Sequence, residues 1–186
     1  MTLILDNGTR HLEELIELVG DCRVIALADW SDVDIEPGEL LVLSGGHSAS
    51  VVSHHEHYQR ELSLISSHNG PILGICLGFE LIATAFGSKL RKIESRHGLV
   101  ELSAVNASAV LEGLASSQVY EAHRWSFEAV GASLMALAQS PDGIEMVRHI
   151  SKPIVGVQFH PEVYENDNAG KVLYRRLLTL IGPPQG

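Results

Sequence analysis

The sequence predicts an α/β protein, in which helices cover both faces of a mostly parallel sheet. Apolar runs at residues 2–6, 23–27, 39–43 and 72–75 are continuous rather than alternating, as expected for strands that are buried on both faces. Helical patterns and polar connections separate these runs, which is the rhythm of this fold class. The second half of the chain is richer in strand-like runs, and we expect an antiparallel addition to the sheet there.

Turn residues and helical spacing divide the first half of the chain. The turn at residues 6–8 ends the first run, and Gly20 ends the amphipathic helix that follows it. Residues 29–38 are polar and form a connection. Residues 53–67 and 81–86 are expected to be helical. The first helix is indicated by apolar residues at the spacing i, i+3, i+4 and i+7, namely Leu12, Leu15, Ile16 and Val19.

The second half contains several shorter strand-like segments. We expect strands at residues 99–102, 118–127, 133–138, 143–148 and 153–159, with residues 118–127 running into a loop. A short helix is expected within residues 106–114 and a closing helix at 169–180. This last helix should bury one face, formed by Val172, Leu173, Leu177 and Leu180.

Size and composition indicate one domain that spans residues 1–186, because the chain shows no internal repeat, linker or low-complexity stretch. The formal net charge of −10 argues against a nucleic-acid or membrane-surface partner. The sequence shows neither a signal peptide nor an apolar run that could cross a bilayer, so a cytoplasmic protein is expected. Its two cysteines, Cys22 and Cys76, do not form a disulfide framework, and we interpret Cys22 as structural.

The most informative stretch is residues 74–78, which have the sequence Gly-Ile-Cys-Leu-Gly. It follows an apolar run and precedes a helical segment, like the nucleophile elbow of hydrolases with cysteine in place of serine. A helix N-terminus at Cys76 would favour the thiolate. Taken alone, the pattern fits equally well a buried cysteine between two packing glycines.

Two further motifs follow predicted strands. His160 and Glu162 stand two residues apart, so in extended chain their side chains point the same way, and a carboxylate fixes the tautomer of an imidazole base. Taken alone, these residues more often form an ordinary loop. Gly45 and Gly46 follow the third strand, where bare backbone can approach a substrate oxyanion or simply turn. Because sites in parallel sheets lie at the carboxyl ends of the strands, all three motifs can share one edge.

The three motifs together resemble the class I (triad) glutamine amidotransferases, and the resemblance covers almost the whole chain. It implies a flavodoxin-like fold in which glutamine is hydrolysed to glutamate and ammonia, and the ammonia passes to a synthase domain or subunit. The compact size and the Ser-Gly-Gly sequence resemble the free-standing glutaminase subunits of GMP synthases, whose ATP-pyrophosphatase partner aminates XMP. The matching segments are residues 43–46, 72–78 and 156–163.

The resemblance also implies roles for individual residues. Cys76 would form a γ-glutamyl thioester, His160 would act as general base and acid, and Glu162 would orient it. The backbone N–H groups of Gly46 and Leu77 would form the oxyanion hole. A loop at residues 123–126 would hold the substrate α-carboxylate through its backbone. The implied substrate-binding residues are Gly45, Glu80, Arg124, Trp125 and Ser126.

The chain departs from the family pattern at three places, namely His47, Phe79–Glu80 and His123–Trp125. Glu80 replaces a glutamine that lies beside the substrate in the family. A carboxylate there would attract a substrate α-ammonium and repel a carboxylate. Glu80 is therefore either a tolerated replacement or the mark of a different γ-glutamyl substrate. A self-contained γ-glutamyl hydrolase or transferase, and a non-catalytic homologue, remain alternatives to the amidotransferase.

Two polar clusters are expected to be solvated surface rather than binding sites. His54–His57 places histidines on one helix face, but adjacent histidines on a polar helix are usually solvated, so no metal or cofactor is expected. Arg91, Lys92, Arg96 and His97 form a basic cluster. We expect a solvated loop there, and a surface that faces a partner is the alternative.

Overall fold

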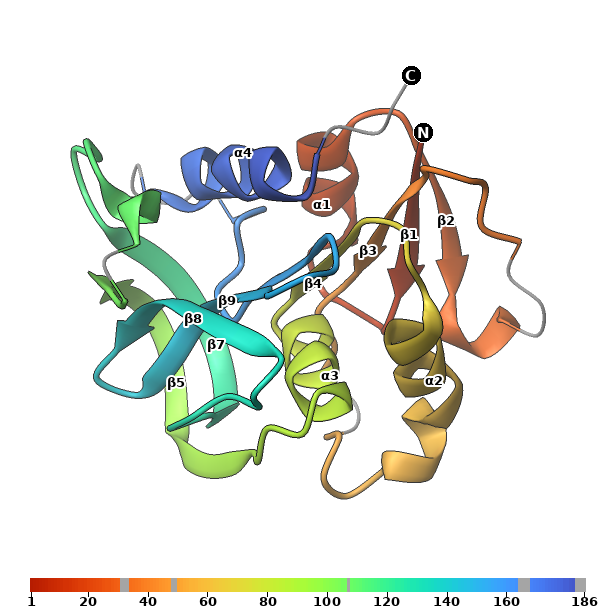
Figure 1. Ribbon diagram of the computed structural model, residues 1–186, viewed down its shortest axis with the longest axis horizontal. Helices are drawn as coiled ribbons and strands as arrows, with labels where there is room; N and C mark the ends of the chain where they lie inside the picture. Colours follow the sequence, from red (N-terminus) through yellow and green to blue (C-terminus); the bar gives the residue numbers. More distant parts are fainter. Residues whose placement is uncertain (31–33, 48–49, 107, 164–167, 183–186) are drawn as a thin grey trace.

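An eight-stranded sheet forms the centre of the computed structural model, which describes residues 1–30, 34–47, 50–106, 108–163 and 168–182 (Figure 1). In spatial order, the strands are β2 (Cys22–Ala26), β1 (Thr2–Asp6), β3 (Leu40–Leu43), β4 (Ile72–Ile75), β10 (Ile154–Val157), β9 (Gly143–His149), β8 (Leu134–Ser140) and β6 (Ser103–Ala104). The first five strands pair in parallel. The last three extend the sheet antiparallel. The predicted fold class is therefore confirmed.

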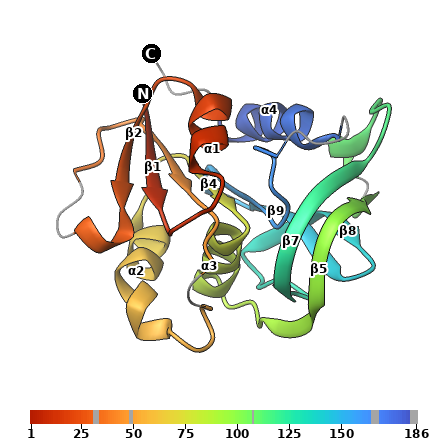
Figure 2. The same ribbon diagram turned by 180° about the vertical axis from the view of Figure 1, so that it is seen from behind.

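Helices cover both faces of this sheet (Figures 1 and 2). Helices α1 (Leu12–Val19) and α4 (Gly170–Ile181) lie on one face, and α2 (Gln59–Ser67) and α3 (Leu77–Ala85) lie on the other. Because successive strand residues point to opposite faces, β1 contributes Ile4 to the α1–α4 core and Leu3 to the α2–α3 core. Within the described part of the chain, no helix is both long and apolar enough to cross a membrane.

A separate two-stranded ribbon stands beside the sheet, formed by β5 (Arg91–Glu101) and β7 (Gln118–Ser126). The sequence predicted loops at residues 91–97 and 123–126, and both predictions are wrong. Residues 91 and 92 of β5 pair with 126 and 125 of β7, and residue 96 pairs with 123. Residues 91–97 of β5 and 123–126 of β7, which pair with each other, are mostly polar. The apolar pattern that marks a strand is therefore absent from these two stretches of the sequence.

The helices differ from the sequence prediction in detail. Residues 55–58 form a 3₁₀ helix, η2 (His55–Tyr58), which leads into α2. In α4, Leu173 and Leu177 are buried as expected, but Val172 and Leu180 are 43% and 47% exposed. Tyr174 is buried in their place, because the sheet-facing stripe of the helix runs through i, i+1 and i+4 here. Short 3₁₀ turns complete the chain as η1 (Leu27–Asp29) and η3 (Ala109–Leu111).

The side-chain carboxyl group of Glu61 in α2 is buried beside Asn7, the residue that follows β1. The side-chain amide of Asn7 donates a hydrogen bond to Glu61 Oε1 at 3.1 Å, and the residue is 0% exposed. Burial raises the pKa of Glu61 to about 7, and the bond from Asn7 only partly opposes this. The fold therefore favours the protonated form of Glu61.

The first testable prediction concerns the stability of a Glu61→Gln variant. Since the folded pKa lies above the ordinary value of 4.5, the free energy of unfolding falls as the pH rises from about 4.5 to about 7. Glutamine keeps an oxygen for Asn7 but cannot ionise. We expect the variant to be more stable than the parent by up to about 3 kcal/mol at pH 8 and by little at pH 4.5. Denaturant titrations at both pH values measure this difference.

The control is Glu17→Gln, which changes an exposed carboxylate on α1 and should leave stability unchanged at both pH values. A gain in the Glu61→Gln variant that is equal at pH 4.5 and pH 8 would contradict the ionisation argument.

Candidate active site

The turn between β4 and α3 holds Cys76 in a strained conformation, with φ 50° and ψ −104°. Two glycines make this turn possible. A Cβ at Gly78 would lie 2.3 Å from the carbonyl oxygen of Leu43, and one at Gly74 would lie 2.5 Å from that of Gly78. The backbones of β3, β4 and α3 therefore touch at the elbow, as the Gly-x-Cys-x-Gly pattern predicts.

Hydrogen bonds from neighbouring strands fix this turn. The N–H of Cys76 donates to the carbonyl of Val157 in β10 at 2.8 Å, and the N–H of Gly78 donates to the carbonyl of Ser44 after β3 at 3.2 Å. The N–H of Glu80 donates to the carbonyl of Cys76 at 3.0 Å, which starts α3. Cys76 is thus held by the two strands that also carry the other motifs.

His160 and Glu162 form a buried pair behind Cys76. The distance between His160 Nδ1 and Glu162 Oε1 is 2.8 Å, and the residues are 5% and 0% exposed. Burial alone would lower the pKa of His160. The charges of Cys76 and Glu162, and hydrogen bonds with both, outweigh burial and raise the pKa of His160 well above its ordinary value. The imidazole therefore lies between a thiol and a carboxylate, and both of these groups favour its protonated form.

The Gly45–Gly46 segment lies against the same groups. A Cβ at Gly45 would lie 3.1 Å from His160 Cε1 and 3.6 Å from Cys76 Cβ, and one at Gly46 would lie 2.5 Å from a methyl group of Leu77. Only bare backbone fits between these side chains without a shift. The structure thus brings the three sequence motifs together at the carboxyl ends of β3, β4 and β10.

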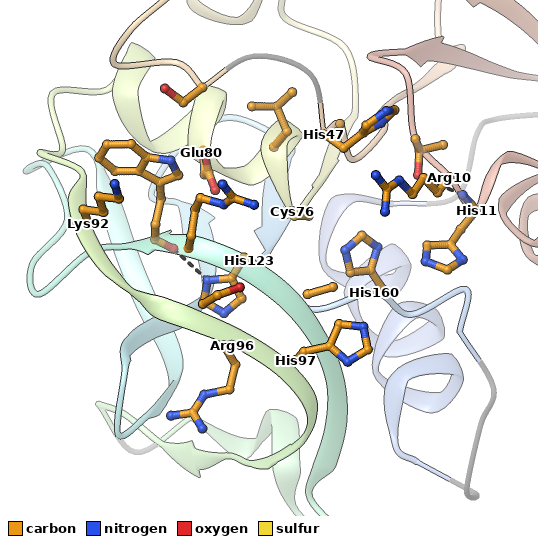
Figure 3. Close-up of a pocket in the computed structure, with 18 residues that line it drawn as sticks. Arg10, His11, His47, Cys76, Glu80, Lys92, Arg96, His97, His123 and His160 are labelled. Atoms are coloured by element: carbon orange, nitrogen blue, oxygen red, sulfur yellow. Dashed lines mark hydrogen bonds between the residues drawn. The ribbon is translucent and has the colours of Figure 1, made fainter.

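A cavity of about 450 Å³ opens onto these residues (Figure 3). The elbow and Gly46 form one wall, residues 9–11 after β1 form another, and the β5–β7 ribbon forms the third. Five of the residues that the sequence assigns to the oxyanion hole or the substrate line it, namely Gly46, Leu77, Glu80, Arg124 and Trp125. The catalytic candidates Cys76 and His160 also line it.

Three assigned residues do not line the cavity. Glu162 lies behind His160, and Gly45 is buried between His160 and Cys76. Ser126 is 0% exposed, and its hydroxyl donates a hydrogen bond to the carbonyl of Asp142 at 2.7 Å. Because residues 123–126 belong to a strand and not to a loop, Ser126 points to the opposite side from Trp125.

Glu80 lies at the buried end of the cavity and is 4% exposed. The amide of Gln158 donates to Glu80 Oε1 at 3.4 Å and lies 3.9 Å from Cys76 Sγ. Burial raises the pKa of Glu80 to about 7, while the bond from Gln158 and the charge of His123 oppose the rise. A carboxyl group that changes charge near neutral pH therefore stands close to the nucleophile candidate.

The sequence analysis missed a second buried polar cluster, made of Glu121, His123 and Glu145. His123 Nδ1 donates to the carbonyl of Trp125 at 2.8 Å, and Nε2 lies 3.1 Å from Glu121 Oε2. Among the described residues, this is the one group of three potential metal ligands that lie within 4.8 Å of one another. Burial and the neighbouring Glu121 raise the pKa of Glu145 well above its ordinary value, so shared protons can satisfy the cluster.

Charged residues at alternating positions of a strand-like segment were the signal for this cluster, because Glu121 and His123 share one face of β7. The signal was lost because residues 123–126 were assigned to a loop that follows the predicted strand. The His54–His57 stretch, in contrast, lies outside the cavity lining and outside the cluster.

Comparison with known proteins identifies a family. Residues 3–180 match the family model described as glutamine amidotransferase class-I. Among the relatives, a subunit of the glutamine-hydrolysing GMP synthase of Pyrococcus abyssi is 30% identical, over 98% of this chain and 99% of the relative. The corresponding subunit of Thermococcus kodakarensis is 28% identical, with the same coverage.

Solved structures show the same fold. A Thermoplasma acidophilum protein, described as a candidate subunit of GMP synthase, superimposes with a TM-score of 0.77 at 25% identity, covering 97% of this chain and 92% of its own. A glutamine amidotransferase of Thermotoga maritima superimposes with a TM-score of 0.75 at 17% identity, covering 97% of both chains. At 17% identity, the match to the Thermotoga maritima protein shows a shared fold and nothing more.

The elbow geometry generates the second testable prediction. In Gly78→Ala, the new methyl group would overlap the carbonyl of Leu43, and backbone cannot move aside as a flexible side chain does. We expect a loss of stability of about 1–3 kcal/mol or more. We also expect a large loss of thiol reactivity, because Cys76 would be displaced. Denaturant titration and the rate of alkylation of Cys76 measure the two effects.

Gly87→Ala is the matched control for the Gly78→Ala variant. Gly87 has φ 85°, and a Cβ there meets nothing within 4 Å, so this variant reports backbone strain without a clash. Because Gly78 does not share this positive φ, a loss in Gly78→Ala comes from the contact, and a Gly78→Ala variant as stable as the parent would show that the backbone contact at the elbow does not constrain the fold.

Proposed function

Because the chain belongs to the class I glutamine amidotransferase family, we propose that it hydrolyses L-glutamine through Cys76, His160 and Glu162 and delivers the ammonia to a synthase subunit. The observation that carries this proposal is the buried His160–Glu162 pair, 2.8 Å apart, in contact with a cysteine held at a strained elbow. We also propose that the chain forms one amidotransferase domain over residues 1–186. The intact set of nucleophile, base and orienting carboxylate argues against a non-catalytic homologue.

The proposed reaction has two halves. Glu162 holds Nδ1 of His160, so Nε2 accepts the thiol proton of Cys76. The sulfur attacks the side-chain amide carbon of glutamine, and the tetrahedral oxyanion collapses to a γ-glutamyl thioester as His160 gives its proton to the departing ammonia. In the second half, His160 takes a proton from water, which attacks the thioester. Glutamate leaves, and Cys76 recovers its proton from His160.

The oxyanion would be stabilised by backbone N–H groups. Leu77 is the first residue of α3, and the first N–H groups of a helix have no partner within the helix. Gly46 lies against Leu77 across the cavity wall. Donors that are fixed before the reaction need no reorganisation when charge develops on the substrate oxygen, which is why such sites lower the barrier.

The substrate's amino-acid end would lie between Glu80 and the ribbon. We propose that Glu80 binds the α-ammonium group, since it is the carboxylate that lines the cavity near Cys76. The backbone at Arg124 and Trp125 would hold the α-carboxylate, and Gly45 would act indirectly, by leaving room for the side chains of His160 and Cys76. Ser126 would contribute only by anchoring the end of β7 through Asp142.

For the acceptor of ammonia, we propose an ATP-pyrophosphatase subunit that converts XMP to GMP. The similarity to GMP synthase subunits over 98% of the chain supports this pathway. In such a two-subunit enzyme, docking of the partner would complete the site and would raise a low basal glutaminase activity.

A second candidate is a self-contained γ-glutamyl hydrolase or transferase, and two observations favour it. Glu80 stands where the family has glutamine, and the cavity of about 450 Å³ lies in the range that accommodates ligands larger than a free amino acid. Turnover of glutamine is compared with turnover of γ-glutamyl peptides, with and without the synthase subunit. Preference for glutamine, increased by the synthase, supports the amidotransferase; preference for peptides, unaffected by the synthase, supports the hydrolase.

The third testable prediction is that Cys76→Ala abolishes ammonia release from glutamine. Loss of a nucleophile typically lowers kcat by a factor of about 10⁴ or more. The far-UV circular dichroism spectrum should be unchanged, because only one sulfur atom is removed. A coupled glutamate dehydrogenase assay measures ammonia. An electrophilic glutamine analogue should label the parent protein and leave the variant unlabelled.

Cys22→Ala is the control for this variant. Cys22 is the chain's other cysteine and lies half-buried in β2, so its loss should leave ammonia release unchanged. Parental activity in a purified Cys76→Ala preparation would refute the proposed mechanism.

The fourth testable prediction is that Glu80→Gln raises the KM for glutamine at pH 8. Because the pKa of Glu80 is about 7, its carboxylate forms mainly above neutral pH, and KM in the parent should fall as the pH rises through 7. A neutral amide replaces a charge-assisted contact by an ordinary one, so we expect KM to rise by about tenfold with little change in kcat. Steady-state kinetics from pH 6 to pH 8.5 measure both constants.

Glu94→Gln serves as the control, since Glu94 is exposed on β5 and outside the cavity lining. An unchanged KM and pH profile in Glu80→Gln would identify Glu80 as a tolerated replacement.

A further inference from the structure

Positive side chains gather around the mouth of the active-site cavity, although the chain carries a net charge of −10. Of the 13 Lys and Arg residues, four line the cavity, whereas only one of the 23 Asp and Glu residues is among its described lining. The four are Arg10, Lys92, Arg96 and Arg124, which we call the cationic mouth. His11, His47 and His97 lie among them (Figure 3).

The residues of the cationic mouth lie on two sides of the cavity opening. Arg10 follows β1 on one side, while Lys92 and Arg96 belong to β5 and Arg124 to β7 on the other. Arg10, Lys92 and Arg124 are exposed. Within the described ranges, no carboxylate lies at ion-pair distance from any of these three.

Arg96 differs from the other three cations. Its guanidinium lies 2.5 Å from Asp142, and its side chain is 42% exposed. Arg91, next to Lys92 but outside the cavity lining, likewise pairs with Glu128 at 3.3 Å. The two ribbon cations without an ion pair in the described ranges, Lys92 and Arg124, therefore both line the cavity, whereas of the two paired ones only Arg96 does.

The position of these charges indicates what they attract. The end of the cavity that would hold the substrate is buried, with Cys76 and Glu80 only 5% and 4% exposed. Glutamine has one carboxylate, which the backbone of β7 would hold. Exposed, solvated cations bind a small anion weakly, but together they attract a large surface of opposite charge and speed its approach.

We propose that the cationic mouth is the docking surface for an acidic face of the synthase subunit that receives the ammonia. This inference rests on the proposed function, because it assigns the partner of the same site. The partner's carboxylates pair with Arg10 and Lys92, which lie on opposite sides of the cavity opening. Docking there covers the opening of the cavity, so the ammonia leaves the site directly into the partner. The basic cluster at residues 91–97 thereby acquires the partner-facing role that was one of its two interpretations.

The test measures association of the full chain with the ATP-pyrophosphatase subunit of GMP synthase from the same genome. Surface plasmon resonance between 50 and 500 mM NaCl gives rate constants and Kd. We expect Kd to weaken at least about tenfold over this range, mainly through the association rate. Lys92→Glu and Arg10→Ala should each weaken binding at 50 mM NaCl, Lys92→Glu by about tenfold, and both should flatten the salt dependence.

The matched control is Arg175→Glu, which reverses an exposed cation on α4 outside the cavity lining and should bind like the parent. Basal glutaminase activity of Lys92→Glu should stay within about twofold of the parent, which shows that the substrate end is intact. Binding of Lys92→Glu and Arg10→Ala that equals binding of Arg175→Glu overturns the inference and leaves the proposed function standing. Failure of the parent to bind the synthase at any salt concentration overturns both.

A second arm tests whether the cations serve the substrate instead. The ratio of kcat/KM for γ-glutamylglutamate to that for γ-glutamylglycine is compared in the parent and in Lys92→Glu. An unchanged ratio supports the docking surface. A ratio that falls severalfold in Lys92→Glu means that Lys92 binds the additional carboxylate of the glutamate leaving group, and this overturns the inference.

Discussion

Contact between bare backbones at the elbow is the constraint on which the rest of this structure depends. Cys76 adopts a φ of 50°, which costs a residue other than glycine about 1–3 kcal/mol unless its surroundings hold it. Bonds to Val157 and Ser44 provide that support. They require β3, β4 and β10 to end side by side, with glycine at 74 and 78. The sheet order and the placement of Cys76 are thus consequences of the same contact.

Burial gives similar carboxyl groups different roles around this site. Glu162 lies 2.8 Å from Nδ1 of His160 and helps to raise the pKa of that histidine. Glu61 and Glu80 accept hydrogen bonds from the neutral amides of Asn7 and Gln158, and burial raises the pKa of each to about 7, although the charge of His123 partly opposes the rise at Glu80. The formal charge of −10 therefore overstates the negative charge of the folded protein near neutral pH.

The sequence predicted well those features that depend on residues close together in the chain. The strand-end glycines, Cys76 and the His160-x-Glu162 pair each belong to a local pattern, and the parallel order that joins them follows from continuous apolar strands. Strands were predicted at residues 99–102 and 118–127, but the rest of the β5–β7 ribbon was predicted as loops, because its pairing joins residues as far apart as 91 and 126 and residues 91–97 are mostly polar. The same error hid the cluster around His123 and assigned Ser126 to the substrate. Side-chain alternation becomes visible only once a segment is known to be a strand.

The cavity divides into a buried end and a positive mouth, and this division has a consequence for the product. Ammonia is a nucleophile only in its neutral form, and a positive potential disfavours its protonated form. If the cationic mouth docks the synthase as proposed, Lys92 and Arg10 would stand beside the path that ammonia takes out of the cavity. Their charges would then do two things at once, by attracting the partner's acidic face and by opposing the escape of ammonium into water. Replacing these cations by neutral side chains would weaken both effects, which couples partner binding to the efficiency of ammonia transfer.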